Sequence, residues 1–155
     1  MLEVESFLKQ GDNFISIINF YNLLSDINYI EGAIKISYQQ KEILTLDNWD
    51  LIDQLWGYFV TGLEQVSKGE KFETYFPDQP LKIAFEPNHD RKRVQIKVGE
   101  DENLKSFVNY DEFVAVMAKE GKFFFRRMIE LSLSPKSYYE ACIKDLDAIE
   151  KTIYQ

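Results

Sequence analysis

The chain has 155 residues, 45% of them hydrophobic, and its 26 acidic and 18 basic residues give a net charge of −8. This length and apolar content predict a single folded domain spanning residues 1–155 with a substantial core. The negative charge argues against non-specific binding to nucleic acid and to anionic membranes, because both depend on basic patches. It is compatible with a basic protein partner drawn in by electrostatic steering.

Cysteine usage and the opening residues bear on the cellular compartment. Cys142 is the only cysteine, so an intramolecular disulfide is excluded. Met1 precedes an acidic stretch of mixed polarity rather than a basic segment and an apolar run, and no run approaches the roughly 20 apolar residues of a membrane span. We therefore expect a cytoplasmic protein.

The first residues predict a β-hairpin. Apolar and polar residues alternate over residues 2–8 and again over 14–20, with a Gly-Asp-Asn turn at 11–13 between them. Residues 14–24 also fit helical spacing, so a helix there stays open as an alternative. The β-branched and aromatic residues of this segment favour the strand.

The segment from Trp49 to Gly69 predicts a helix with an unusually wide apolar side. At about 100° per residue, its apolar residues cover half of the cylinder, and they are Leu51, Ile52, Leu55, Trp56, Tyr58, Phe59, Val60, Leu63 and Val66. Such a helix needs a broad apolar cover, which we expect from strands on either side of it. We expect Asp47 or Asn48 to cap its N-terminus.

Strands are predicted on both sides of this helix. A second hairpin is expected over residues 33–38 and 42–46 before it, and an antiparallel meander over residues 81–108 after it. Two further helices are expected, one opened by Asn109 with Glu112 as a capping box and one opened by Ser134-Pro135. The predicted fold class is α+β: a mostly antiparallel sheet of hairpins and a meander, with one long inserted helix and two C-terminal helices packed on one face.

No catalytic, cofactor-binding or metal site is predicted. Asp47, Asp50 and Asp53 step around a helix by about 60° each, so they do not converge, and we assign them to capping and to the helix dipole. A nucleophilic dyad of Cys142 with His89, the only histidine, would need an exposed thiol of lowered pKa. Cys142 lies instead on the core side of the last helix, and His89 lies in a turn.

A basic run, Arg91-Lys92-Arg93, opens one strand of the meander, with Lys97 on the same face as Arg93. A phosphate or RNA site there would need aromatic residues for stacking, and this hairpin has none. We therefore interpret the run as a solvated surface. Phosphate-binding glycine-rich loops are also absent from the sequence.

A candidate protein interface lies on the flank of the second long helix. Val116, Phe123 and Arg127 share a side that differs from the core side, and aromatic residues with arginine are frequent in interface hot spots. The alternative is that another helix of the same chain packs there.

These observations favour a small, non-catalytic, acidic, cytoplasmic protein-binding module, and an inhibitor-like or immunity-like role toward a basic protein would suit its acidity and its lack of catalytic motifs. One alternative is a self-associating structural domain that forms a homodimer through Phe123. Another is an enzyme whose scattered carboxylates a single sequence does not reveal.

Overall fold

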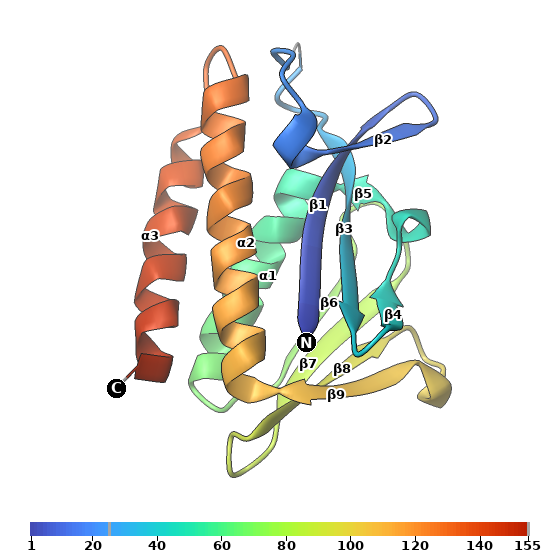
Figure 1. The fold of residues 1–155 in the computed structure, drawn as a ribbon, viewed down its shortest axis with the longest axis vertical. Helices are drawn as coiled ribbons and strands as arrows, with labels where there is room; N and C mark the ends of the chain where they lie inside the picture. The colour runs from blue at the N-terminus through green and yellow to red at the C-terminus, as the bar shows by residue number, and fades with distance from the viewer. Residues whose placement is uncertain (25, 155) are drawn as a thin grey trace.

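The computed structural model describes residues 1–24 and 26–154 and confirms the α+β class, with two antiparallel sheets and three α-helices (Figure 1). The first sheet has strand order β2-β1-β3-β4, with β5 paired to β3. Its strands are β1 (Leu2–Gln10), β2 (Asn13–Ser16), β3 (Glu31–Tyr38), β4 (Lys41–Leu44) and β5 (Asp50–Leu51). The second sheet is the meander β6 (Phe72–Tyr75), β7 (Lys82–Pro87), β8 (Arg93–Val98) and β9 (Lys105–Asn109). The helices are α1 (Ile52–Ser67), α2 (Tyr110–Leu131) and α3 (Ser137–Lys151).

The opening hairpin is present, but the segment after it differs from both sequence-based alternatives. Strand β2 ends at Ser16, and a short 3₁₀ helix, η1 (Ile17–Asn19), follows it. The Ser16 hydroxyl accepts a hydrogen bond from the Ile18 backbone amide, while Ile17 is buried. This local cap and one buried side chain turn the backbone before either a long strand or a helix can form.

The inserted helix begins later than expected. Asp47 and Asn48 belong to a separate 3₁₀ turn, η2 (Leu46–Asn48), which is capped by Thr45. Strand β5 lies between this turn and α1 and pairs with β3. The residue that precedes α1 is therefore Leu51, which makes no side-chain cap. The expectation that Asp47 or Asn48 caps this helix was therefore wrong.

Helix α1 lies at the centre of the molecule. It contacts β3 of the first sheet, β6 and β7 of the second sheet, and both C-terminal helices. Trp56 and Phe59 are fully buried, and the Trp56 indole nitrogen donates a hydrogen bond to the Ser6 hydroxyl on β1 at 3.0 Å. Most of the wide apolar side expected from the sequence is thus covered from several directions at once, but Tyr58, which was expected on that side, is exposed.

The C-terminal helices complete this cover. Asn109 caps α2 by accepting a hydrogen bond from the Glu112 amide at 2.8 Å, whereas the Glu112 carboxylate accepts from the Leu2 amide, so only the Asn109 half of the expected capping box is formed. The expectation that Ser134-Pro135 opens the last helix was wrong, because α3 begins at Ser137 after Lys136, which makes no side-chain cap. Helix α2 packs against β1, β8, β9 and α1, and α3 lies along its outer side (Figure 1). A Cβ atom at Gly121 would lie only 2.9 Å from Leu146 and 3.0 Å from Trp56, so the absence of a side chain there lets the three helices approach.

We expect Phe59→Ala to lower the free energy of unfolding by about 3–5 kcal/mol, because it removes a fully buried ring and leaves a cavity. Chemical denaturation followed by circular dichroism measures this loss. Tyr58→Ala is the matched control, since the neighbouring Tyr58 is 38% exposed. Equal losses for the two variants would contradict the central position of α1.

Candidate protein-binding surface

Asp53 in the first turn of α1 is a buried carboxylate at the centre of a polar cluster. Its side chain is 2% exposed, and its Oδ2 atom accepts hydrogen bonds from the Lys136 ammonium at 3.1 Å, the Tyr138 hydroxyl at 2.8 Å and the Tyr139 hydroxyl at 3.0 Å. The sequence assigned Asp53 to the helix dipole alone. Its three donors lie far along the chain, so spacing within the helix could not reveal them.

The Asp53 cluster joins α1 to the start of α3. Burial, together with the hydrogen bond to Asp53 and its negative charge, raises the pKa of Tyr138 and of Tyr139, so both hydroxyls stay protonated and donate at neutral pH. The five principal cavities among the described residues are not lined by Asp53. The contacts of the cluster join α1 to the start of α3.

We expect Asp53→Ala to destabilise the fold by about 3–5 kcal/mol, because it leaves a partly buried ammonium and two hydroxyls without their acceptor. Urea unfolding at neutral pH checks this loss. Asp47→Ala is the control, because Asp47 is exposed. A loss for Asp53→Ala no larger than the loss for Asp47→Ala would show that the cluster does not hold the helices together.

The two nucleophile candidates lie on different elements. His89 is exposed in the turn between β7 and β8, while Cys142 lies on α3 and is only partly buried, less than the sequence led us to expect. Burial, reinforced by the nearby Asp145 carboxylate, raises the pKa of the Cys142 thiol to about 11. A dyad would require the opposite shift of that pKa.

The raised thiol pKa predicts slow labelling of Cys142 in the folded protein. Because the pKa of the Cys142 thiol is about 11, its labelling rate in the folded protein should still be rising at about pH 10. In the unfolded chain the labelling rate should level off above about pH 8.5, the ordinary pKa of a cysteine. Reaction with a chromogenic disulfide reagent measures both rates, with circular dichroism showing that the fold persists. A native rate that levels off near or below neutral pH would revive the nucleophile hypothesis.

The three predicted interface residues lie along one edge of α2. Val116 and Phe123 are partly buried and pack against the core. The Arg127 guanidinium donates to the Ile17 and Phe20 carbonyls and pairs with Glu130. Arg127 therefore holds the segment after β2 against α2, and its role as an interface anchor stays a prediction.

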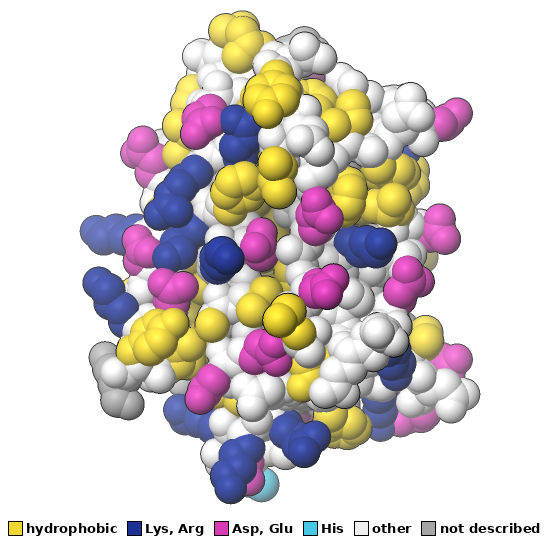
Figure 2. Space-filling view, in the orientation of Figure 1, with side chains coloured by type: hydrophobic (Ala, Val, Ile, Leu, Met, Phe, Trp, Pro, Cys, Tyr) yellow, Lys and Arg dark blue, Asp and Glu magenta, His cyan; other side chains and the backbone are white. Residues whose placement is uncertain are grey.

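Next to Val116, the seam between β1 and α2 opens into a groove of about 700 Å³. Its apolar lining includes Val4, Ile18 and Val116, and Ile18 is 57% exposed. Four carboxylates and two lysines also line the groove, and they are Glu3, Glu5, Glu112, Glu120, Lys35 and Lys119, so the balance of side-chain charge in the lining is negative. Figure 2 shows acidic, basic and apolar side chains mixed on this face of the molecule. We call this feature the acidic groove.

The carboxylates of the acidic groove outnumber its two lysines and make no ion pairs with other described residues. Among the described residues, no lysine or arginine nitrogen lies within the 4.0 Å of an ion pair from any of the four. Glu5 accepts a hydrogen bond from the Ser16 hydroxyl at 2.6 Å, and Glu112 accepts one from the Leu2 amide at 2.8 Å. Burial raises the pKa of Glu120; Lys119 opposes this shift and Glu5 adds to it.

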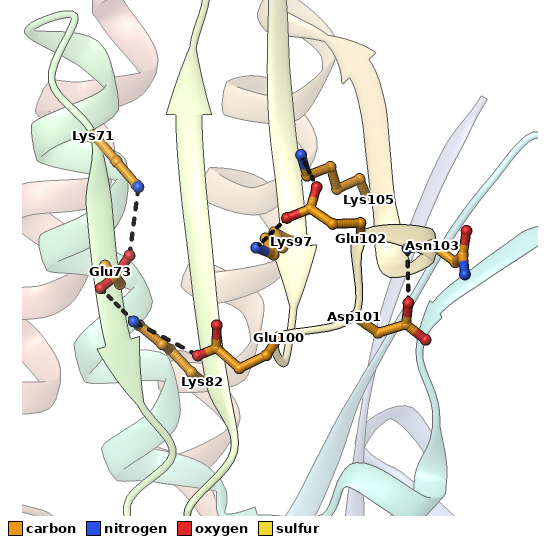
Figure 3. A network of polar contacts seen from close by, with 9 residues as sticks. All are labelled: Lys71, Glu73, Lys82, Lys97, Glu100, Asp101, Glu102, Asn103 and Lys105. Carbon is orange, nitrogen blue, oxygen red and sulfur yellow. Dashed lines mark hydrogen bonds and ion pairs between the residues drawn. The ribbon is translucent and has the colours of Figure 1, made fainter.

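A second acidic segment, the turn over residues 99–103, differs from the groove because two of its three carboxylates are in ion pairs. Glu102 pairs with Lys97 at 2.9 Å and with Lys105, and Glu100 pairs with Lys82 at 3.8 Å (Figure 3). The hydrogen bonds from Lys105 and Lys97 lower the pKa of Glu102 to about 2. This turn therefore offers a partner less net charge than its sequence indicates.

Exposed apolar side chains continue from the acidic groove to one end of the molecule. Here the segment after η1 meets the connection between α2 and α3, and the Leu24 amide donates to the Leu131 carbonyl at 2.9 Å. The side chains exposed at this end are Tyr21, Leu23, Tyr29 and Leu133. We call them the apolar apex, and clusters of this kind mark contact surfaces more often than isolated apolar residues do.

Comparison with known proteins gives no family assignment, because no family model, curated protein or solved structure matches the chain. Within the described residues, no helix combines the length and apolarity needed to cross a membrane. The same residues contain no group of three or more histidine, cysteine, aspartate or glutamate side chains arranged to hold a metal ion.

Proposed function

We propose that this protein is a non-catalytic binding module of the cytoplasm, and that its acidic groove receives a basic, amphipathic segment of a partner protein. The observation that carries this proposal is a groove with an apolar lining and four carboxylates, which outnumber the two lysines of the same groove and have no ion-pair partners among the described residues. An inhibitor-like or immunity-like role is the form of this function that best suits the small acidic chain.

The two kinds of groove residue would contribute differently to binding. Exposed carboxylates such as Glu3 would attract lysine and arginine side chains and speed association, and added salt would weaken this effect. The apolar lining at Val116 and Ile18 would supply contact area that excludes water. A helix with apolar residues on one side and basic residues on its flanks meets both requirements.

Charge favours a different protein over a second copy of this chain. Two copies would each bring a net charge of −8, and pairing one acidic groove with another would place like charges together. The apolar apex, which adjoins the groove through Ile18 and Tyr21, would add contact area for a partner larger than a single peptide.

Selection from a random peptide library displayed on phage tests the proposal without a known partner. We expect the selected peptides to be basic and amphipathic. Val116→Asp, and separately Glu3→Lys combined with Glu120→Lys, should each weaken their binding by at least about tenfold in a titration. Leu104→Asp and Glu140→Lys are matched controls, because they place the same changes on exposed residues outside the groove.

Two results would contradict the proposal. One is a set of selected peptides with no excess of basic residues. The other is binding that the groove variants and the control variants weaken equally, with circular dichroism showing that all variants are folded.

A further inference from the structure

A second cavity has the opposite charge. Between β3, the turn before β8 and the start of α2 lies a space of about 440 Å³, lined by three consecutive cations, Arg91, Lys92 and Arg93. Two aromatic residues, Tyr38 and Phe107, line it as well. This volume lies within the range of small-molecule sites, about 300–1,000 Å³.

Strand pairing places an aromatic ring beside the basic run. Arg93 of β8 pairs with Asn109 of β9, and residues two apart on a strand share a face of the sheet, so Phe107 lies diagonally next to Arg93. Phe107 is 51% exposed and its ring is available for stacking. The sequence argument that this site lacks an aromatic ring considered only the hairpin of the basic run, and the ring comes from the next strand.

Two turns of the backbone position the residues that line the cavity. Gln39 and Gln40 both adopt positive φ in the tight turn that joins β3 to β4, and this turn brings Tyr38 to the cavity. On the opposite side, a guanidinium nitrogen of Arg91 donates to the Ser67 carbonyl at 3.1 Å, and the Lys92 carbonyl accepts from the Tyr110 amide at 2.9 Å. The cations are therefore carried by a hydrogen-bonded turn.

The charge of this cavity is uncompensated. Other lysines on the same sheet, including Lys82, Lys97 and Lys105, are paired with glutamates (Figure 3). Among the described residues, no carboxylate lies within 4.0 Å of the charged nitrogens of Arg91, Lys92 or Arg93. Asp111 is the one carboxylate in the lining, so the balance of charge there is positive.

We propose that this cavity binds a nucleotide, with the phosphates held by Arg93 and Lys92 and the base stacked on Phe107. Guanidinium and ammonium groups are the side chains that recognise phosphate, and an exposed aromatic ring accepts a planar base. A free mononucleotide suits the chain better than a long strand, because a net charge of −8 opposes extended contact with a phosphate backbone. This site is separate from the acidic groove and does not depend on the proposed function.

Isothermal titration at low ionic strength tests the proposal with four probes: ADP, ATP, ribose 5-phosphate and an oligoadenylate of about ten nucleotides. We expect ADP or ATP to bind with a Kd below about 1 mM, and ribose 5-phosphate, which lacks the base, to bind more weakly. If the oligoadenylate binds more tightly than ADP, the ligand that supplies the phosphate and the base is the end of a nucleic-acid strand rather than a free nucleotide.

Matched variants locate the binding. Arg93→Glu and Phe107→Ala should each weaken ADP binding by about tenfold or more. Lys144→Glu and Tyr75→Ala, which alter an exposed cation on α3 and an exposed aromatic residue on β6, should leave it unchanged. Failure of every nucleotide to bind, or equal weakening by the control pair, would overturn the proposal; thermal melts of the variants establish that they are folded.

Discussion

Burial of α1 is the constraint on which the rest of this structure depends. Trp56 and Phe59 have no exposed surface, and no single sheet covers both sides of the helix that carries them. Phe59 packs edge-on against Phe85 of the second sheet, and Trp56 stacks on Phe124 of α2. The aromatic contacts therefore run from one sheet through α1 to the C-terminal helices, and burial of such area is the main stabilising contribution to a fold of this size.

Covering a central helix with two sheets and two helices leaves seams where these layers meet, and both candidate sites lie at seams. The acidic groove opens where β1 and α2 separate, beside Val116. The basic cavity lies where the turn after β3 approaches the basic run and the start of α2. The charges at the two sites are opposite, and neither set is neutralised by ion pairs among the described residues, in contrast to the paired glutamates and lysines on the outer face of the second sheet (Figure 3). Two separate seams of opposite charge are the basis on which we propose two different ligands.

The sequence predicted the helices, strands and caps that are determined by residues close together along the chain. Periodicity located α1 and the meander, and the spacing of Asn109 and Glu112 located the start of α2. Contacts between distant segments were not predictable in this way. The three donors to Asp53 and the position of Phe107 beside Arg93 arise only when the helices and strands pack. Periodicity also failed to predict the segment after Ser16, where the Ser16 hydroxyl cap and the buried Ile17 accompany a short 3₁₀ helix.

The central claim is that the acidic groove is a binding surface for a basic, amphipathic segment. The most direct measurement is a two-dimensional ¹⁵N–¹H NMR titration of the protein with a peptide selected for binding. The account predicts that the backbone amides with the largest shifts lie along β1 and the first half of α2, including those of Glu3, Val116 and Glu120, and that added salt reduces these shifts by weakening the complex. Shifts concentrated on the second sheet or on α3, with the β1–α2 seam unchanged, would contradict it.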